Sequence, residues 1–298
     1  MEQLEKKQCP ICDSGNIHFH FHTNDYMITQ EKFSVFKCDE CGFLFTNPVP
    51  SVSSIGKYYE SEVYVSHSNT KKGIKNFVYH LVRNFTLQRK IDLVQRYVPK
   101  GRLLDVGSGA GYFLNKAFSC GFDVTGLEPS EAVRMEAEQN FALDFRPIEQ
   151  LYELPFKSID VITLWHVLEH VYNLNEDVPQ MLKLLKDDGV LIVAVPNPDS
   201  WDAKFYGEKW GGWDVPRHLY HFRKEDVSNL FQKYGAEIVE IKPMQFDPVY
   251  VSMLSEQYMG RNILYALWNG MRSYFHKNSH GCTSQIYVIK KKTDFKEF

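Results

Sequence analysis

From residue 103 onward, short apolar runs alternate with segments whose apolar positions recur every three or four residues. The runs that predict strands are 103–106, 124–128, 142–145, 159–164, 190–195, 238–241 and 286–289. The segments that predict helices are 111–120, 130–140, 175–185 and 224–234, with Ser130 and Asn175 as N-caps and Asn140 as a C-terminal cap. This alternation predicts a parallel α/β sheet. Since 190–195 is apolar throughout, we expect it to be a central strand with both faces buried.

The N-terminal part of the chain has a weaker pattern. Short strands are predicted at 17–21 and 33–36, and a linker rich in Pro and Ser follows at 48–73. Residues 74–98 keep helical spacing, but the apolar face shifts near Thr86, which leaves a kinked helix or two helices open. A late insertion, 243–281, contains two helix-like segments, 249–258 and 263–275. We expect three parts, which are 1–47, 48–100 and 101–298, with the insertion as a lid over the substrate.

Composition and charge exclude some classes of function. The chain has 298 residues, of which 44% are hydrophobic and 24% are charged, and its net charge is −3. Nucleic-acid-binding domains are normally basic, so we expect no nucleic-acid partner. No apolar run reaches the roughly 18 residues of a membrane span, and no apolar leader precedes the first cysteine. These features predict a cytoplasmic protein that does not bind a membrane.

Four of the six cysteines form two C-x-x-C pairs that are separated by 25 residues. They are Cys9, Cys12, Cys38 and Cys41. Two such pairs can place four thiolates around one tetrahedral zinc ion, and short strands between them are typical of a zinc ribbon. A redox-active pair is the alternative, but no βαβ pattern surrounds these cysteines. A unit this small has little core of its own, so the metal would supply much of its folding energy.

The strand at 103–106 runs into a loop with three alternating glycines. The residues concerned are Asp105, Gly107, Ser108, Gly109 and Gly111, and the acidic Glu128 ends the next strand. A dinucleotide fingerprint would need a glycine at position 112, where this chain has tyrosine. A P-loop would need a Lys-Ser or Lys-Thr pair, and none follows. A glycine-rich turn without a ligand is the alternative, and Glu128 argues against it because a carboxylate can accept hydrogen bonds from a vicinal diol.

The pattern D-x-G-x-G-x-G resembles the first motif of class I S-adenosylmethionine-dependent methyltransferases. The resemblance implies that the glycine loop lies against the methionine part of the cofactor and that Glu128 binds the ribose hydroxyls. It also implies a Rossmann-like sheet of seven strands in which the last one is antiparallel. With the small zinc ribbon and the helical insertion, this is the fold that we expect.

Two later segments extend the resemblance to a subfamily of these enzymes. They are Leu164–Val171, which continues the strand at 159–164, and Pro216–Phe222, which follows the Pro196-Asn197 pair. The resemblance implies that Leu164, Trp165 and His166 line the methionine end of the cofactor, and that Ile148 and Glu149 lie on its adenine side. His166, His218 and His221 are candidates for a general base, since imidazole titrates near neutral pH. Glu169 is either catalytic or orients its own segment.

The leading hypothesis is a methyltransferase that acts on an oxygen or nitrogen atom, less often carbon, of a small molecule. A sugar or a precursor of a secondary metabolite would be a suitable acceptor. One alternative is an RNA or protein methyltransferase whose zinc ribbon holds the macromolecule, although residues 1–47 carry four Lys and no Arg against seven acidic residues. Another is a scaffold that binds S-adenosylmethionine without catalysis. The intact glycine loop and Glu128 argue against the scaffold.

Overall fold

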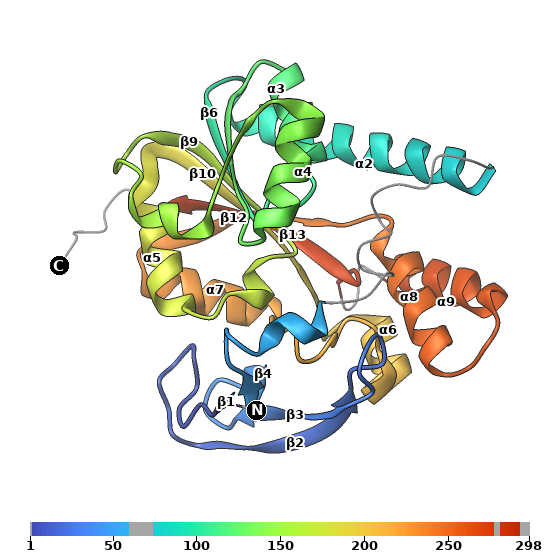
Figure 1. The fold of residues 1–298 in the computed structure, drawn as a ribbon. Coiled ribbons are helices and arrows are strands. Elements are labelled where there is room, and N and C mark those ends of the chain that lie inside the picture. The colour runs from blue at the N-terminus through green and yellow to red at the C-terminus, as the bar shows by residue number, and fades with distance from the viewer. Residues whose placement is uncertain (1, 60–73, 277–280, 293–298) are drawn as a thin grey trace.

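The computed structural model describes residues 2–59, 74–276 and 281–292, and a seven-stranded sheet forms its centre (Figure 1). The strand order is β12-β13-β10-β9-β6-β7-β8. The bounds are β6 Arg102–Val106, β7 Asp123–Leu127, β8 Asp144–Arg146, β9 Ile159–Trp165, β10 Leu185–Pro196, β12 Ala236–Pro243 and β13 Ser284–Lys291. Six of these strands run in the same direction, and β13, between β12 and β10, runs opposite to them. The expected Rossmann-like methyltransferase topology is confirmed.

Helices cover both faces of this sheet. They are α2 Ile74–Tyr97, α3 Tyr112–Ser119, α4 Glu131–Phe141, α5 Leu174–Leu184 and α7 Lys224–Lys233. One apolar core joins α2, α3 and α4 to the sheet, and the other joins α5 and α7 to its opposite face. All apolar side chains of β10 from Val190 to Val195 are buried, as expected of a central strand. Within the described residues, no helix is long and apolar enough to cross a membrane.

The N-terminal residues form a second sheet, which a strand from the later part of the chain completes. Its order is β11-β4-β3-β2, with β2 Ile17–Asn24, β3 Lys32–Cys38, β4 Leu44–Thr46 and β11 Tyr220–His221. A small pair, β1 Gln3–Leu4 with β5 Val49–Pro50, lies beside it. Because β11 follows the strand β10 of the main sheet, the two sheets are tied by backbone pairing as well as by side chains. Figure 1 shows the second sheet at the end of the molecule away from α3.

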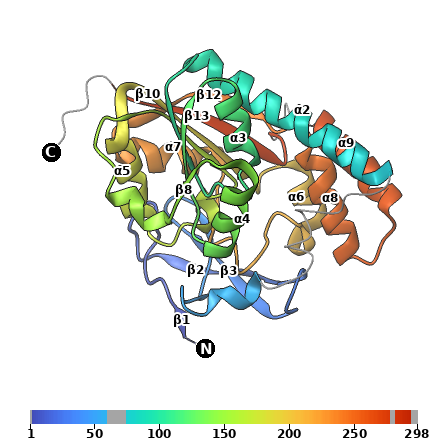
Figure 2. The ribbon, with the colours of Figure 1, turned by 45° about the horizontal axis from the view of Figure 1, so that its top comes forward.

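The late insertion forms a helical hairpin. Its helices are α8 Asp247–Tyr258 and α9 Ile263–Phe275, and they lie beside α6 Trp201–Tyr206 in both views (Figures 1 and 2). The buried carboxylate of Asp202 holds this contact, since it accepts hydrogen bonds from Ser273 and Thr283. The predicted helices are confirmed, while their role as a lid stays a prediction.

Some local predictions are wrong at helix ends. Asn173, not Asn175, precedes α5, and the Asn175 amide instead donates to the carbonyl of Pro10 at 2.9 Å. Helix α4 continues past Asn140, and Ala142 takes the left-handed conformation with φ 51°. The α2 segment is one helix across Thr86. Of the predicted linker 48–73, residues 60–73 lie outside the described residues.

A buried guanidinium joins the N-terminal part of the chain to the segment before β11. The side chain of Arg217 is 1% exposed, and its Nη2 lies 2.9 Å from the carboxylate of Asp25, which belongs to the N-terminal part. The same group forms an ion pair with Asp214, and its Nη1 donates to the carbonyl of Tyr58 at 2.8 Å. These three partners come from three separate segments, so Arg217 fixes their relative positions.

We predict that Arg217→Met lowers the free energy of unfolding by about 3–5 kcal/mol, because it leaves two buried carboxylates without a counter-ion. Denaturant unfolding followed by tryptophan fluorescence measures the change. The matched control is Arg102→Met, which breaks an ion pair with Asp123 whose two side chains are 60% and 73% exposed. That variant should lose less than about 1 kcal/mol. Equal losses in the two variants would contradict the assignment.

Candidate functional site

The glycine loop lies at the carboxyl edge of the main sheet, between β6 and α3. The backbone N–H groups of Gly107 and Ser108 both donate to the carbonyl of Leu127, at 2.7 and 3.0 Å. A Cβ on Gly107 would lie 2.5 Å from the side chain of Val167, whereas nothing lies within 4 Å of a Cβ built on Gly109. The loop is therefore packed tightly at Gly107 and open at Gly109, where a ligand can approach the backbone.

Glu128 follows β7 and points back to this loop. Its two carboxylate oxygens accept hydrogen bonds from the backbone N–H groups of Gly109, at 2.9 Å, and Ser130, at 3.0 Å. Burial raises the pKa of Glu128, and these two donors oppose the rise. Each oxygen keeps a second lone pair, so the carboxylate is held in place and can still accept from a ligand.

Asp105 lies beneath the loop, in contact with other side chains. It is 2% exposed and accepts a hydrogen bond from the hydroxyl of Thr163 at 2.6 Å. Burial raises the pKa of Asp105 and lowers that of Lys90, and the attraction between the two groups opposes both shifts. The ammonium of Lys90 also lies 4.3 Å from the ring centre of Trp165. Asp105 therefore supports the site from below.

Two polar atoms near the loop lack a partner. The hydroxyl of Ser108 and the indole Nε1 of Trp165 are buried without a hydrogen bond. Buried polar groups are nearly always hydrogen-bonded, so orphaned atoms at a sheet edge suggest that a ligand supplies the partner. These residues fit S-adenosylmethionine. Other residues predicted to bind the cofactor have different surroundings. Leu164 is fully buried in the core, and Gly111 packs against Phe145. Ile148 and Glu149 lie in a 3₁₀ helix that follows β8.

His166 lies directly after β9 with a positive φ of 59°. Its Nε2 is 3.0 Å from the carboxylate of Asp247 and its Nδ1 is 3.3 Å from Glu169. Burial lowers the pKa of His166, but the two carboxylates outweigh it and raise the pKa to about 10. His166 is therefore a cation at neutral pH and a poor proton acceptor.

His218 and His170 face the same buried carboxylate, that of Glu169. The Nε2 of His218 lies 4.0 Å from Glu169 and 3.8 Å from Asp214. The ring centres of His170 and His218 are 4.7 Å apart. Burial, with the neighbouring His218, lowers the pKa of His170 to about 4. The four side chains form one group next to the carboxyl end of β9.

His221 is turned away from this group and contacts the N-terminal sheet. Its Nε2 lies 3.2 Å from the hydroxyl of Thr46, and its ring meets the edge of Trp213. Burial holds the pKa of His221 well below its usual value. The surroundings of His221 indicate a structural residue that fixes β11 on β4.

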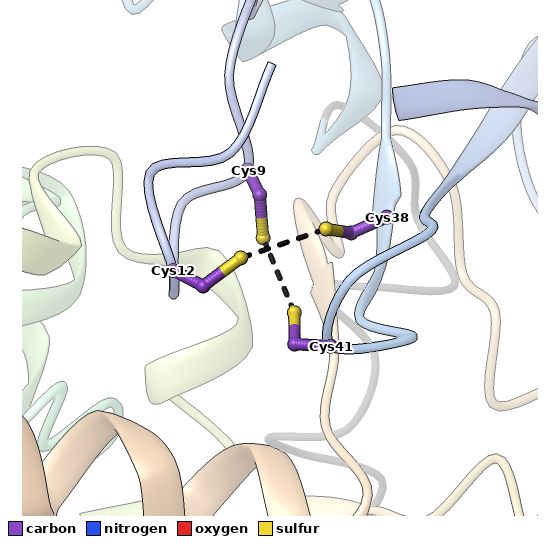
Figure 3. A group of neighbouring side chains, drawn as sticks. All are labelled: Cys9, Cys12, Cys38 and Cys41. Atoms are coloured by element: carbon purple, nitrogen blue, oxygen red, sulfur yellow. Dashed lines mark hydrogen bonds between the residues drawn. The ribbon is translucent and has the colours of Figure 1, made fainter. Parts of the chain in front are cut away.

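The four cysteines converge (Figure 3). The sulfur atoms of Cys9 and Cys41 are 3.5 Å apart, as are those of Cys12 and Cys38. Gly42, with φ 74°, closes the second turn through a hydrogen bond to the carbonyl of Cys38. Burial raises the pKa of Cys9 to about 11, whereas at Cys38 burial is outweighed by the backbone N–H donors of Cys41 and Glu40, which lower the pKa. The donor set and its geometry fit a tetrahedral metal ion.

Space for a small molecule adjoins this site. A cavity of about 360 Å³ lies between α2 and the end of β12, and Lys90, Met244 and Phe246 are among its walls. The sulfur of Met244 is 3.3 Å from Nε2 of His166, so one wall residue of the cavity contacts the site.

Comparison with known proteins gives the family. Residues 82–241 match the sequence model of the methyltransferase domain, which is more than half of the chain. The chain belongs to the S-adenosylmethionine-dependent methyltransferases.

The methyltransferase resembles several curated and solved proteins. It is 32% identical over 133 residues to the ubiquinone biosynthesis O-methyltransferase of Maricaulis maris, a match that covers 41% of this chain and 52% of that one. Over 161 residues it is 29% identical to the enzyme of the same name from Nitrosococcus oceani, covering 50% and 68%. The alignment thus spans about half the length of the first relative.

Two solved structures show the same fold at low identity. A methyltransferase from Archaeoglobus fulgidus superposes with a TM-score of 0.51 at 18% identity, covering 70% of this chain and 94% of that one. Phosphoethanolamine N-methyltransferase 2 of Haemonchus contortus superposes with a TM-score of 0.54 at 14% identity, covering 98% and 71%. These likenesses support the fold of the methyltransferase.

Sequence reasoning missed three charged residues of this site. Asp247 begins the insertion helix α8, far along the chain from His166, and no local pattern marks it. Lys90 lies within a helix among many other cations. Of the three, Asp214 alone could have been found from the sequence, because it lies three residues before Arg217 in a segment rich in tryptophan and glycine.

We predict that His166 of the methyltransferase stays protonated until the pH approaches 10, and that Asp247→Asn moves its pKa toward the ordinary 6.5. Because the folded-state pKa is raised, the stabilisation is complete below the unfolded value of about 6.5 and is lost as the pH rises through 10. Nitrogen NMR of the imidazole groups, with unfolding free energies across this range, measures both effects. Titration of His166 near 6.5 in the wild type would contradict the assignment.

Proposed function

We propose that this methyltransferase transfers the methyl group of S-adenosylmethionine to an oxygen atom of a small molecule, with nitrogen as the second choice of acceptor. The observation that carries the proposal is the glycine loop with Glu128, placed beside a buried group of histidines and carboxylates. The relatives named as O-methyltransferases support an oxygen acceptor. A sugar or a metabolite precursor with a free hydroxyl is the class of acceptor that we expect.

The residues of this chain have separate roles toward the cofactor. The backbone of Gly109 and the hydroxyl of Ser108 lie against it, and Glu128 accepts hydrogen bonds from its ribose. The indole N–H of Trp165 offers a further donor. When bound, S-adenosylmethionine supplies a sulfonium-activated methyl group for in-line displacement. The chain then has to align the acceptor and take up its proton.

Proton removal is assigned to the group around Glu169 and His218. The Nδ1 of His218 lies 2.9 Å from the carbonyl of Gly212, and a carbonyl only accepts, so Nδ1 carries the hydrogen. In the neutral ring the lone pair is then on Nε2, the atom that faces Glu169. His166 is a cation and His221 is bound to Thr46, so His218 is the histidine best placed to act on an acceptor proton.

The four cysteines are proposed to hold a structural zinc ion. The cluster is built into the fold, because the guanidinium of Arg223 donates to the carbonyl of Cys41 at 2.8 Å. Lys233 also pairs with Asp13 in the first cysteine turn at 2.8 Å. A unit whose surface is occupied by the rest of its own chain suits a structural role better than a docking arm for RNA or protein.

Glu128→Ala should weaken the binding of S-adenosylmethionine by about 1.5–3 kcal/mol, because charge-assisted hydrogen bonds are lost. The dissociation constant should therefore rise by roughly ten- to a hundredfold, as measured by calorimetry. Glu131→Ala, an exposed acidic residue in the first turn of α4, is the matched control and should bind as the wild type does. A wild type that ignores S-adenosylmethionine or binds NAD tightly instead would overturn the proposal.

His218→Ala should leave cofactor affinity nearly unchanged and reduce turnover by roughly 10²- to 10⁴-fold, the range for loss of a proton acceptor. Transfer of labelled methyl to a panel of phenols and sugars measures turnover, and the pH profile of the active acceptor is then compared. His221→Ala serves as the control, with a small expected effect on rate per folded molecule. Wild-type turnover and pH profile in His218→Ala would make His218 structural.

A further inference from the structure

Glu169 is an unusual carboxylate for a protein interior. It is 0% exposed, and neither of its oxygens has a hydrogen-bond partner. The nearest group, Nδ1 of His166, lies 3.3 Å away as an ion-pair contact without hydrogen-bond geometry. The cation His166 offsets part of the cost of this buried charge, and because neither oxygen accepts a hydrogen bond, both keep lone pairs for a further cation.

Two imidazole rings are oriented toward this carboxylate. The Nδ1 of His170 lies 2.9 Å from the carbonyl of Arg217, and the Nδ1 of His218 lies 2.9 Å from the carbonyl of Gly212. A carbonyl only accepts, so both Nδ1 atoms carry a hydrogen, and in the neutral form of each ring Nε2 keeps the lone pair that a metal ion needs. Backbone carbonyls that fix the tautomer in this way are typical partners of metal-binding histidines.

The surrounding charges also favour a dication. Ion pairs connect four carboxylates, those of Asp25, Glu169, Asp214 and Asp247, to the cations Arg217 and His166. Lys90 lies next to this chain of contacts and acts on Asp247, and Asp105, whose pKa burial raises to about 7, lies beside Lys90. These ion pairs set four carboxylates against two cations around the fully buried Glu169, a local excess of negative charge that is compatible with a bound divalent ion.

We propose that Glu169, His170 and His218 form a second metal site, separate from the four cysteines, which takes a divalent transition ion such as zinc. Their ligand atoms lie within 4.8 Å of one another. Tetrahedral ligands at about 2.0–2.2 Å from one ion lie about 3.3–3.6 Å from one another, so the three side chains have to close in by up to about 1.5 Å when the ion binds. Two nitrogens and one carboxylate select zinc or iron over magnesium, and they leave a position open.

This metal site would take part in the proposed function. Metal binding itself does not depend on that function, but a role of the ion in methyl transfer rests on it. With an ion bound, the lone pair of His218 would be a ligand, and an acceptor hydroxyl at the open position would release its proton to solvent, because the ion lowers the pKa of that hydroxyl. Without an ion, the same lone pair takes the proton directly. A metal-assisted site would select acceptors that present an oxygen atom, such as a phenol or a diol.

Metal content tests the site without any assay of turnover. The full-length protein is purified without chelators, equilibrated with Zn²⁺, desalted and analysed for zinc by mass spectrometry. The wild type should hold about two ions per chain, and Glu169→Gln about one. His218→Gln, at the edge of the group, is the second variant and should also hold about one. His20→Gln, an exposed histidine of the N-terminal sheet, is the control and should keep both ions.

Cobalt identifies which ion has been lost. Cobalt bound by the four cysteines gives thiolate-to-metal absorption, so this band should be unchanged in Glu169→Gln while the total cobalt falls by half. A wild type with only the thiolate-bound ion would overturn the proposal, as would variants that keep both ions. Because calorimetry with S-adenosylmethionine is a separate measurement, failure of the metal site and failure of the methyltransferase function are distinguishable.

Discussion

One buried guanidinium determines how the site is assembled. Arg217 pairs through its side chain with Asp25 from the N-terminal part and with Asp214 from the tryptophan-rich segment. Its backbone carbonyl accepts the hydrogen of His170. Since His218 is the next residue, the position of Arg217 sets both imidazole rings relative to Glu169. The second sheet is therefore part of the framework of the site.

This framework gives each histidine a different state. His166 is held as a cation by Asp247 and Glu169. Its ion pair with Asp247 also joins the end of β9 to the start of the insertion helix α8. His170 and His218 keep neutral-tautomer hydrogen bonds to backbone carbonyls. His221 is used to hold β11 on β4. Residue type alone does not separate these roles, because they follow from partners that the fold brings together.

The sequence predicted most of the frame and the local motifs, for physical reasons. Apolar runs mark buried strands, and the glycine loop needs positive φ angles that glycine adopts easily, so both are visible in the chain itself. Helix ends were predicted less well. Asn175 was expected to cap α5, but its side chain instead contacts the carbonyl of Pro10 in another segment. The ion pair of His166 with Asp247 could not be predicted from the sequence, since it depends on how a distant insertion packs. Cofactor and catalytic residues remain predictions.

The central claim is that a cofactor binds at the carboxyl edge of the main sheet, between the glycine loop and Glu128. Hydrogen exchange of the full-length protein, with and without S-adenosylhomocysteine, tests it most directly. The account predicts slower exchange in the peptides that contain Gly109 and Ser130, whose N–H groups bracket Glu128. Unchanged exchange in both peptides at saturating ligand, or protection confined to another part of the chain, would contradict it.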